Sequence, residues 1–166
     1  MNDMHYDAEA LQELSKAFLL NASGTRVEMF SPYLDEAWHR LEAAGDQYDE
    51  FCQTWVGARV DHQREPEEGL VTFVEKYEER YGALPLIWFR NINGTIRQDV
   101  YGQYRDTGMI HASWNCRPAM RGFRAPAPKD LNVPSPEIDK TDKAPVRDEG
   151  TARRDSGTVL PEKKAE

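Results

Sequence analysis

Cysteine is scarce in this sequence, and long apolar runs and a secretory signal are missing. The two cysteines, Cys52 and Cys116, are too few for a dense disulfide framework. No stretch approaches the about 18 apolar residues that a membrane span needs, and residues 1–5 contain no basic region followed by an apolar run. We therefore expect a cytoplasmic protein with no membrane association and with both thiols reduced. A Cys52–Cys116 disulfide would require export without a recognisable signal.

Strong enzyme signatures are missing as well. The sequence has no glycine-rich phosphate loop, no nucleophile elbow and no strong paired-carboxylate motif. An enzyme is therefore not the leading expectation for this chain.

Basic side chains are outnumbered by acidic ones. The 21 Lys and Arg residues stand against 29 Asp and Glu residues, which gives a formal net charge of −8. Residues 129–166 contain eight basic and nine acidic side chains, so −7 of this charge falls on residues 1–124. Such a body repels phosphate, and we expect no direct nucleic-acid binding, for which cationic side chains supply most of the affinity. It favours solubility and attraction to a protein partner with a basic surface.

Aromatic residues disappear after residue 124. Residues 125–166 contain none, whereas six of the ten prolines lie there among charged residues of both signs. Such a segment buries too little apolar surface to offset the entropy of ordering it. We predict one globular helical domain over residues 1–124 and a disordered, charged tail over residues 125–166.

Apolar residues at helical spacing dominate the N-terminal half. Residues 7–20 place Leu11, Leu14 and Phe18 on one stripe, and residues 21–24 end this first helix. Ser31 and Pro32 begin a second helix, as a capping hydroxyl followed by proline at the first helical position. Its apolar stripe consists of Leu34, Ala37, Trp38 and Leu41.

A third helix is expected between Gly45 and Gly57. Its apolar residues are Tyr48, Phe51, Cys52 and Trp55. Because only Gly45 and Asp46 separate it from the second helix, we expect the two to form an antiparallel hairpin. The aromatic residues predicted to fill the core are Trp38, Phe51, Trp55 and Trp88.

The remaining elements are a fourth helix and a small irregular region. The helix begins near Pro66 and ends at Gly82. Its inward side chains are Leu70, Phe73, Val74, Tyr77 and Tyr81. Residues 95–105 suit one more short helix, and residues 86–89 and 109–114 could pair as a small sheet. The predicted fold class is mainly α, with about four helices and a short irregular or β element.

Two histidines and a cysteine lie among the aromatic residues of this helical core. His39 lies six residues before Gly45 and Cys52 seven after it, so in a hairpin both are about 9–10 Å from the turn, at the same level. Asp35 is one helical turn before His39, and His62 can fold back from beyond the third helix. This set of nitrogen, sulfur and oxygen ligands would suit zinc rather than magnesium or calcium.

Other interpretations of these residues stay open. Cys52 on the apolar stripe can act as a small hydrophobe, and Asp35 can satisfy His39 in a purely structural polar cluster. Nucleophilic catalysis by Cys52, with His39 or His62 as the base, is disfavoured because a cysteine in mid-helix lacks the environment that lowers a thiol pKa.

The ordered set of motifs resembles a known family. Residues 34–39 (LDEAWH), residues 48–52 (YDEFC) and residues 60–62 (VDH) ahead of Pro66 are similar to the glycine-rich-domain-containing protein family of plants and its bacterial relatives. That family shows a W-H-x-H helix, a Y-x-x-F-C helix and an H-H pair before a proline. The likeness covers residues 31–89 and implies a helical fold.

The chain departs from the family pattern at two histidines. Leu41 stands where W-H-x-H has its second histidine, and Asp61 stands where the H-H pair has its first. The glycine-rich region is absent. If the family's histidines form a metal site, the resemblance implies that this chain keeps His39 and His62, with Asp61 as an oxygen substitute.

Three functions follow as expectations. The leading one is a noncatalytic intracellular accessory protein whose acidic surface binds a protein partner. The alternative is a small metal-binding protein or metalloenzyme, with zinc as the candidate metal. Its candidate ligands are Asp35, His39, Cys52, Asp61 and His62. The third function is an acidic inhibitor that imitates nucleic acid.

Overall fold

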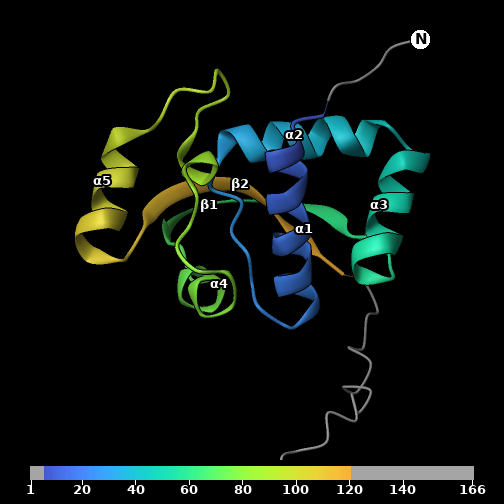
Figure 1. The fold of residues 1–166 in the computed structure, drawn as a ribbon, viewed down its shortest axis with the longest axis horizontal. Coiled ribbons are helices and arrows are strands. Elements are labelled where there is room, and N and C mark those ends of the chain that lie inside the picture. Colours follow the sequence, from blue (N-terminus) through green and yellow to red (C-terminus); the bar gives the residue numbers. More distant parts are fainter. Residues whose placement is uncertain (1–5, 121–166) are drawn as a thin grey trace, which may run out of the picture. The chain divides into compact units, whose positions relative to one another are not determined.

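The computed structural model describes residues 6–120, and these form a mainly helical domain, as predicted (Figure 1). The elements in chain order are α1 (Ala8–Ala22), α2 (Pro32–Ala43), α3 (Asp46–Val56), β1 (Asp61–Leu70), α4 (Val74–Tyr81), the 3-10 turn η1 (Leu86–Phe89), α5 (Gln98–Thr107) and β2 (His111–Ala119). In Figure 1 the ribbon of β1 and β2 passes behind α1. The predicted tail, residues 125–166, lies outside the described residues.

The starts of the first two helices are as predicted. The Asp7 side chain caps α1 by accepting a hydrogen bond from the Glu9 amide at 3.0 Å. Ser31 caps α2 by accepting from the Leu34 amide at 3.2 Å, and its hydroxyl donates to the Ile87 carbonyl at 3.1 Å. Ser31 thus fixes the start of the helix and also joins it to η1.

Helices α2 and α3 do not form the predicted antiparallel hairpin. Figure 1 shows α3 turning away from the direction of α2. Phe18 of α1 explains the corner, since its ring contacts Trp38 at 5.2 Å, Tyr48 at 6.4 Å and Phe51 at 5.9 Å between centroids. The apolar stripes of α2 and α3 both contact α1, and they meet each other where Trp38 Nε1 donates to the Tyr48 hydroxyl at 3.0 Å. Gly45, at φ 57°, allows the abrupt change of direction.

The predicted fourth helix is wrong in its first half. Residues 61–70 form β1, and only Val74–Tyr81 is helical. The strand pairs antiparallel with β2, with Asp61 opposite Ala119 and Leu70 opposite His111. The paired residues are 41 to 58 positions apart in the sequence, so no local pattern reveals the strand.

Pro66 lies in an irregularity of the ribbon rather than at a helix start. The register shifts between Arg64, which pairs with Cys116, and Glu67, which pairs with Trp114. A β-bulge tolerates a residue without an amide hydrogen, because the ladder is already interrupted there. Proline is therefore accommodated within a ten-residue strand.

The predicted pairing of residues 86–89 with residues 109–114 is also wrong. The first segment is η1, where Ile87, Trp88 and Phe89 are buried. The second forms the start of β2, which pairs with β1. The short helix expected over residues 95–105 is α5 (Gln98–Thr107), and it buries Val100 and Tyr104.

The core is largely aromatic, but one predicted member is on the surface. Trp38 and Trp88 are fully buried and Phe51 is partly buried, whereas Trp55 is 46% exposed. Trp55 lies in the last turn of α3, where its ring contacts Phe51 at 6.4 Å between centroids. A buried carboxylate, Glu13, is tied into the core by three donors. These are Lys16 Nζ at 2.6 Å, the Tyr77 hydroxyl at 2.6 Å and Trp88 Nε1 at 2.8 Å.

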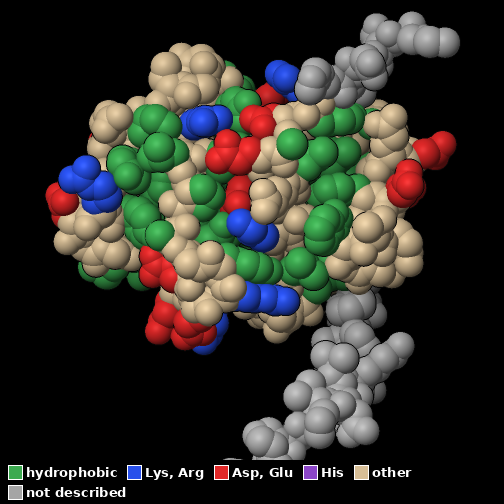
Figure 2. All heavy atoms as spheres, viewed as in Figure 1, with side chains coloured by type: hydrophobic (Ala, Val, Ile, Leu, Met, Phe, Trp, Pro, Cys, Tyr) green, Lys and Arg blue, Asp and Glu red, His purple; other side chains and the backbone are tan. Residues whose placement is uncertain are grey.

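Charged side chains of both signs are scattered over the face drawn in Figure 2. On the face drawn in Figure 2, Lys and Arg side chains alternate with acidic and apolar ones, without a continuous patch of either sign. None of the helices within residues 6–120 is both long and apolar enough to cross a membrane.

Candidate metal site

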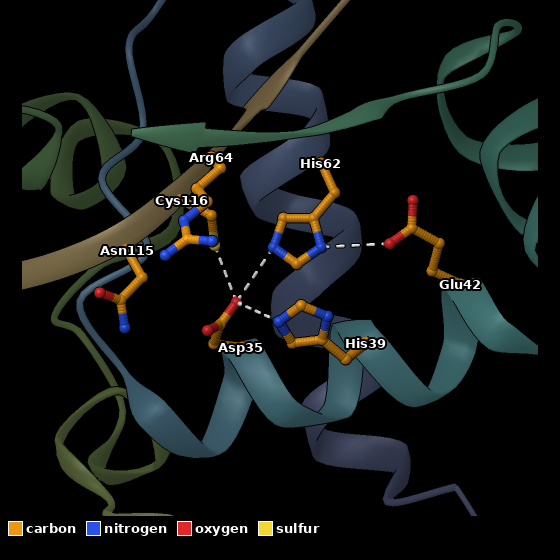
Figure 3. A pocket seen from close by; sticks show the side chains of 7 residues that line it. All are labelled: Asp35, His39, Glu42, His62, Arg64, Asn115 and Cys116. Carbon is orange, nitrogen blue, oxygen red and sulfur yellow. Dashed lines mark hydrogen bonds and ion pairs between the residues drawn. The ribbon is translucent and has the colours of Figure 1, made fainter. Parts of the chain in front are cut away.

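A pocket of about 500 Å³ opens between α2 and the β1–β2 ribbon. Figure 3 shows the side chains that surround it. They are Asp35, His39, Glu42, His62, Arg64, Asn115 and Cys116.

Asp35 lies at the centre of the polar contacts. Its Oδ1 atom is 3.2 Å from His62 Nε2 and 3.7 Å from His39 Nε2. The Cys116 thiol donates a hydrogen bond to the same oxygen at 2.7 Å. One carboxylate oxygen therefore gathers groups from α2, β1 and β2, which are far apart in the sequence (Figure 3).

Helical periodicity places three of these residues on one face of α2. Asp35, His39 and Glu42 follow at i, i+4 and i+7, so their side chains lie above one another. The neighbouring stripe of α2 buries Leu34, Trp38 and Leu41. The polar face therefore lies at the border between the core and solvent, where side chains can be partly desolvated and still meet a ligand.

The position of His62 is set by a chain of contacts from the core. Trp38 Nε1 donates to the Tyr48 hydroxyl at 3.0 Å, which in turn donates to the Val60 carbonyl at 2.6 Å. These bonds hold the chain just before β1. Two residues later the His62 ring stacks on Trp38, with centroids 4.0 Å apart and planes at 15°. The His62 side chain is 7% exposed, so its orientation is fixed by packing.

Both ring nitrogens of His62 face carboxylates in the structure. Nε2 is 3.2 Å from Asp35, and Nδ1 is 3.2 Å from Glu42. A neutral imidazole has a single N–H, so only the imidazolium can donate to both oxygens. Burial opposes the charged form, but Asp35 and Glu42 outweigh it and raise the pKa of His62.

Asp35 is held in its ionised form by the same contacts. Burial acts to raise its pKa, but the hydrogen bonds from His62 and Cys116 outweigh that effect, and the pKa lies below its usual value. The site therefore presents a carboxylate at the pH of a cell.

Both thiols are protonated in the metal-free structure. Burial, followed by the Asp35 carboxylate, raises the pKa of the Cys116 thiol, which stays protonated and donates to Asp35. Burial also raises the pKa of Cys52, whose side chain lies against Tyr48 and the Val60 backbone. Cys52 is fully buried and does not line the pocket, as expected of a small hydrophobe. Both thiols are free.

The structure thus brings together three of the five predicted ligands. Ligand atoms of Asp35, His39 and His62 all lie within 4.8 Å of one another. Cys52 is elsewhere because α2 and α3 meet at a corner rather than side by side. Asp61 begins β1 and is not among the residues that line the pocket, since neighbouring residues of a strand point to opposite faces.

Sequence reasoning missed four residues of the pocket. Glu42 continues the i, i+4, i+7 pattern of α2, a signal that was present in the sequence. Arg64 follows His62 at the period of a strand, but this signal is only readable once residues 61–70 are recognised as strand. Asn115 and Cys116 are likewise recognisable as pocket residues only once β2 is known to pair with β1. Within β2 the alternate residues Ala112, Trp114 and Cys116 are buried.

The spacing of the ligand atoms suits a small transition-metal ion. In a tetrahedral zinc site with bonds of about 2.0–2.1 Å, neighbouring ligand atoms are about 3.3 Å apart. The observed separations from Asp35 Oδ1 are 3.2 Å to His62 Nε2 and 3.7 Å to His39 Nε2. An ion could therefore enter with a small rotation of His39, whose side chain is 55% exposed.

A second hollow of about 460 Å³ adjoins the pocket, and Asp35, His39 and Asn115 line both. Its wall also includes Trp114, whose buried indole N–H has no acceptor within residues 6–120. The two hollows together leave room for an organic ligand beside the candidate metal position.

Comparison with known proteins adds nothing to this geometry: no family model, no curated protein and no solved structure matches the chain. The resemblance to the glycine-rich-domain-containing family stays a prediction.

Proposed function

We propose that the protein binds a divalent transition metal, with zinc as the first candidate, through Asp35, His39 and His62. The observation that supports this is the convergence of one carboxylate and two imidazoles, from two different elements, within 4.8 Å at the wall of a pocket. Two imidazole nitrogens favour zinc, iron or copper over magnesium or calcium, which prefer oxygen ligands.

Three protein ligands leave at least one coordination position open. Structural zinc sites usually have four protein ligands, whereas three ligands and an open position are typical of sites that bind water or substrate. Cys116 and Glu42 would support such a site by orienting the Asp35 carboxylate and the His62 ring through hydrogen bonds. The proposed function is therefore a metal-binding protein that can accept a further ligand at the metal.

Titration of the full-length protein with zinc in a calorimeter tests this proposal. We expect one zinc ion per chain, and we expect Asp35→Asn and His39→Ala each to weaken binding by at least about 10- to 100-fold, the loss typical of a residue that only supports a ligand. His111→Ala is the matched control, because His111 is exposed and lines neither hollow. Wild-type affinity in both ligand variants, or no stoichiometric binding, would remove the metal site.

The other two expected functions stay predictions. Binding of a basic protein partner and imitation of nucleic acid both require a concentrated acidic surface, and the face in Figure 2 offers acidic side chains interspersed with basic ones.

A further inference from the structure

We infer that the ligand completing this site is a small oxyanion, which Arg64 and Asn115 hold beside the metal. The inference rests on the metal site proposed above and names the class of molecule that would occupy the open position.

Arg64 is unusual among the cations of this domain. Every other lysine and arginine within residues 6–120 contacts a carboxylate, a carbonyl oxygen or an aromatic ring. Arg64 has no such contact in that part of the chain, although it lines a pocket with Asp35 and Glu42. Its side chain is exposed and therefore accessible to a ligand that enters the pocket.

The neighbouring acid is engaged elsewhere. Glu65 follows Arg64 directly but forms an ion pair with Arg117 and another with Arg26, the latter at 3.5 Å. The guanidinium of Arg64 lies on the pocket side of the ribbon, beside Cys116, with which Arg64 pairs across the strands (Figure 3).

The ribbon irregularity places a second polar group beside Arg64. Cys116 pairs with Arg64 and Trp114 pairs with Glu67, so Asn115 lies opposite the bulge. β-Bulges commonly redirect side chains at functional sites. The exposed Asn115 amide lines both hollows and makes no side-chain hydrogen bond within the described residues. It thus offers two N–H donors on the side of the pocket where Arg64 lies.

The charges of the site favour an anion once a metal is bound. Asp35 and Glu42 together supply two negative charges, which a divalent ion cancels. His39 and His62 ligate a metal as neutral imidazoles, so Arg64 remains as one uncompensated positive charge. An oxyanion would neutralise it and fill the open coordination position.

The chemistry of the donors specifies oxygen rather than a halide. A guanidinium presents parallel N–H groups that match two oxygens of a carboxylate, a phosphate or a sulfate. The Asn115 amide can donate to the same group, and a metal of this kind readily binds an anionic oxygen. The pocket of about 500 Å³ holds a small anion easily.

Visible spectroscopy of the full-length protein loaded with Co²⁺ tests the inference. The d–d absorption of the bound ion reports on its fourth ligand, and sodium acetate and sodium sulfate are the two probes, titrated at constant ionic strength. We expect a saturable spectral change, with acetate indicating a carboxylate ligand and sulfate a tetrahedral oxyanion. Measured on protein saturated with Co²⁺, Arg64→Gln should raise the apparent dissociation constant for the anion about tenfold or more, as expected for loss of a charge-assisted bond.

Arg105→Gln is the matched control, since Arg105 is an exposed arginine on α5 that lines neither hollow. Normal Co²⁺ binding with no saturable response to either anion would overturn the oxyanion inference and leave the metal site intact. Equal anion affinity in Arg64→Gln and the wild type would also overturn it. Absence of Co²⁺ binding would instead contradict the proposed function, and the oxyanion inference with it.

Discussion

The imidazole of His62 lies flat against the indole of Trp38, with ring centroids 4.0 Å apart and an angle of 15° between the planes. Trp38 is fully buried, and its Nε1 atom is already bonded to Tyr48. A core residue thus supports one of the candidate ligands from behind.

Truncation of Trp38 should strongly destabilise the domain. Trp38→Ala removes a large buried side chain, and we expect it to lower the free energy of unfolding by about 3–5 kcal/mol in urea denaturation. Trp55→Ala is the matched control: this tryptophan is 46% exposed, so its loss should cost well under half as much. Equal effects of the two substitutions would mean that Trp38 is not the core residue described above.

Removal of the Tyr48 hydroxyl should cost about 1–3 kcal/mol of unfolding free energy. Tyr48→Phe leaves the Trp38 N–H and the Val60 carbonyl without their buried partner. The comparison variant is Tyr101→Phe, whose ring is only partly buried. We also expect Tyr48→Phe to weaken zinc binding, because the start of β1 and hence His62 lose an anchor. An unchanged stability would show that these bonds do not hold the strand.

Glu13 should be far more important for stability than an acidic residue on the surface. Glu13→Ala leaves Lys16, Tyr77 and Trp88 without their common acceptor, and we expect a loss of about 3–5 kcal/mol. Glu79→Ala breaks an exposed pair with Lys76 and should cost about 1 kcal/mol or less. Denaturant titration of both variants makes the comparison, and a loss for Glu13→Ala no larger than that for Glu79→Ala would be contrary to expectation.

The stability of the metal-free protein should depend on pH through His62. Its folded-state pKa lies above the ordinary value of 6.5 because Asp35 and Glu42 outweigh the effect of burial. A raised pKa stabilises the fold fully below the unfolded-state value, and this contribution disappears as the pH rises through the folded-state value. Asp35 acts at the acid end: its pKa is lowered, so its contribution is lost only as the pH falls below about 3.8.

Urea denaturation of wild type and His62→Gln in the presence of a chelator isolates this effect. The difference in unfolding free energy should be largest near about pH 5.5 and should shrink towards about pH 9. A difference that grows with pH would mean that His62 is buried in its neutral form.

Local patterns were sufficient to predict the first three helices and α5. Capping at Ser31 and the periodicity of Leu34, Trp38 and Leu41 are properties of adjacent residues, and the structure confirms them. The direction of α3 relative to α2 was not predictable in this way. It depends on Phe18, which lies on a different helix and contacts both.

The strand β1 was missed for a similar reason. The acidic residues after Pro66 and the apolar residues up to Tyr81 suit a helix locally, but the backbone of residues 61–70 finds its partner in β2. The candidate site was therefore only half predicted. Asp35, His39 and His62 were predicted as ligands from the sequence motifs. Arg64, Asn115 and Cys116 reach the pocket through the pairing of β1 with β2, which no nearby residue signals.

The most direct measurement is an anomalous difference map at the zinc absorption edge, from crystals of the full-length protein grown with one equivalent of zinc. We expect a single strong peak bonded to Asp35, His39 and His62 at about 2.0–2.2 Å. A map with no peak among these three side chains, or with the zinc held by other residues, would contradict the account.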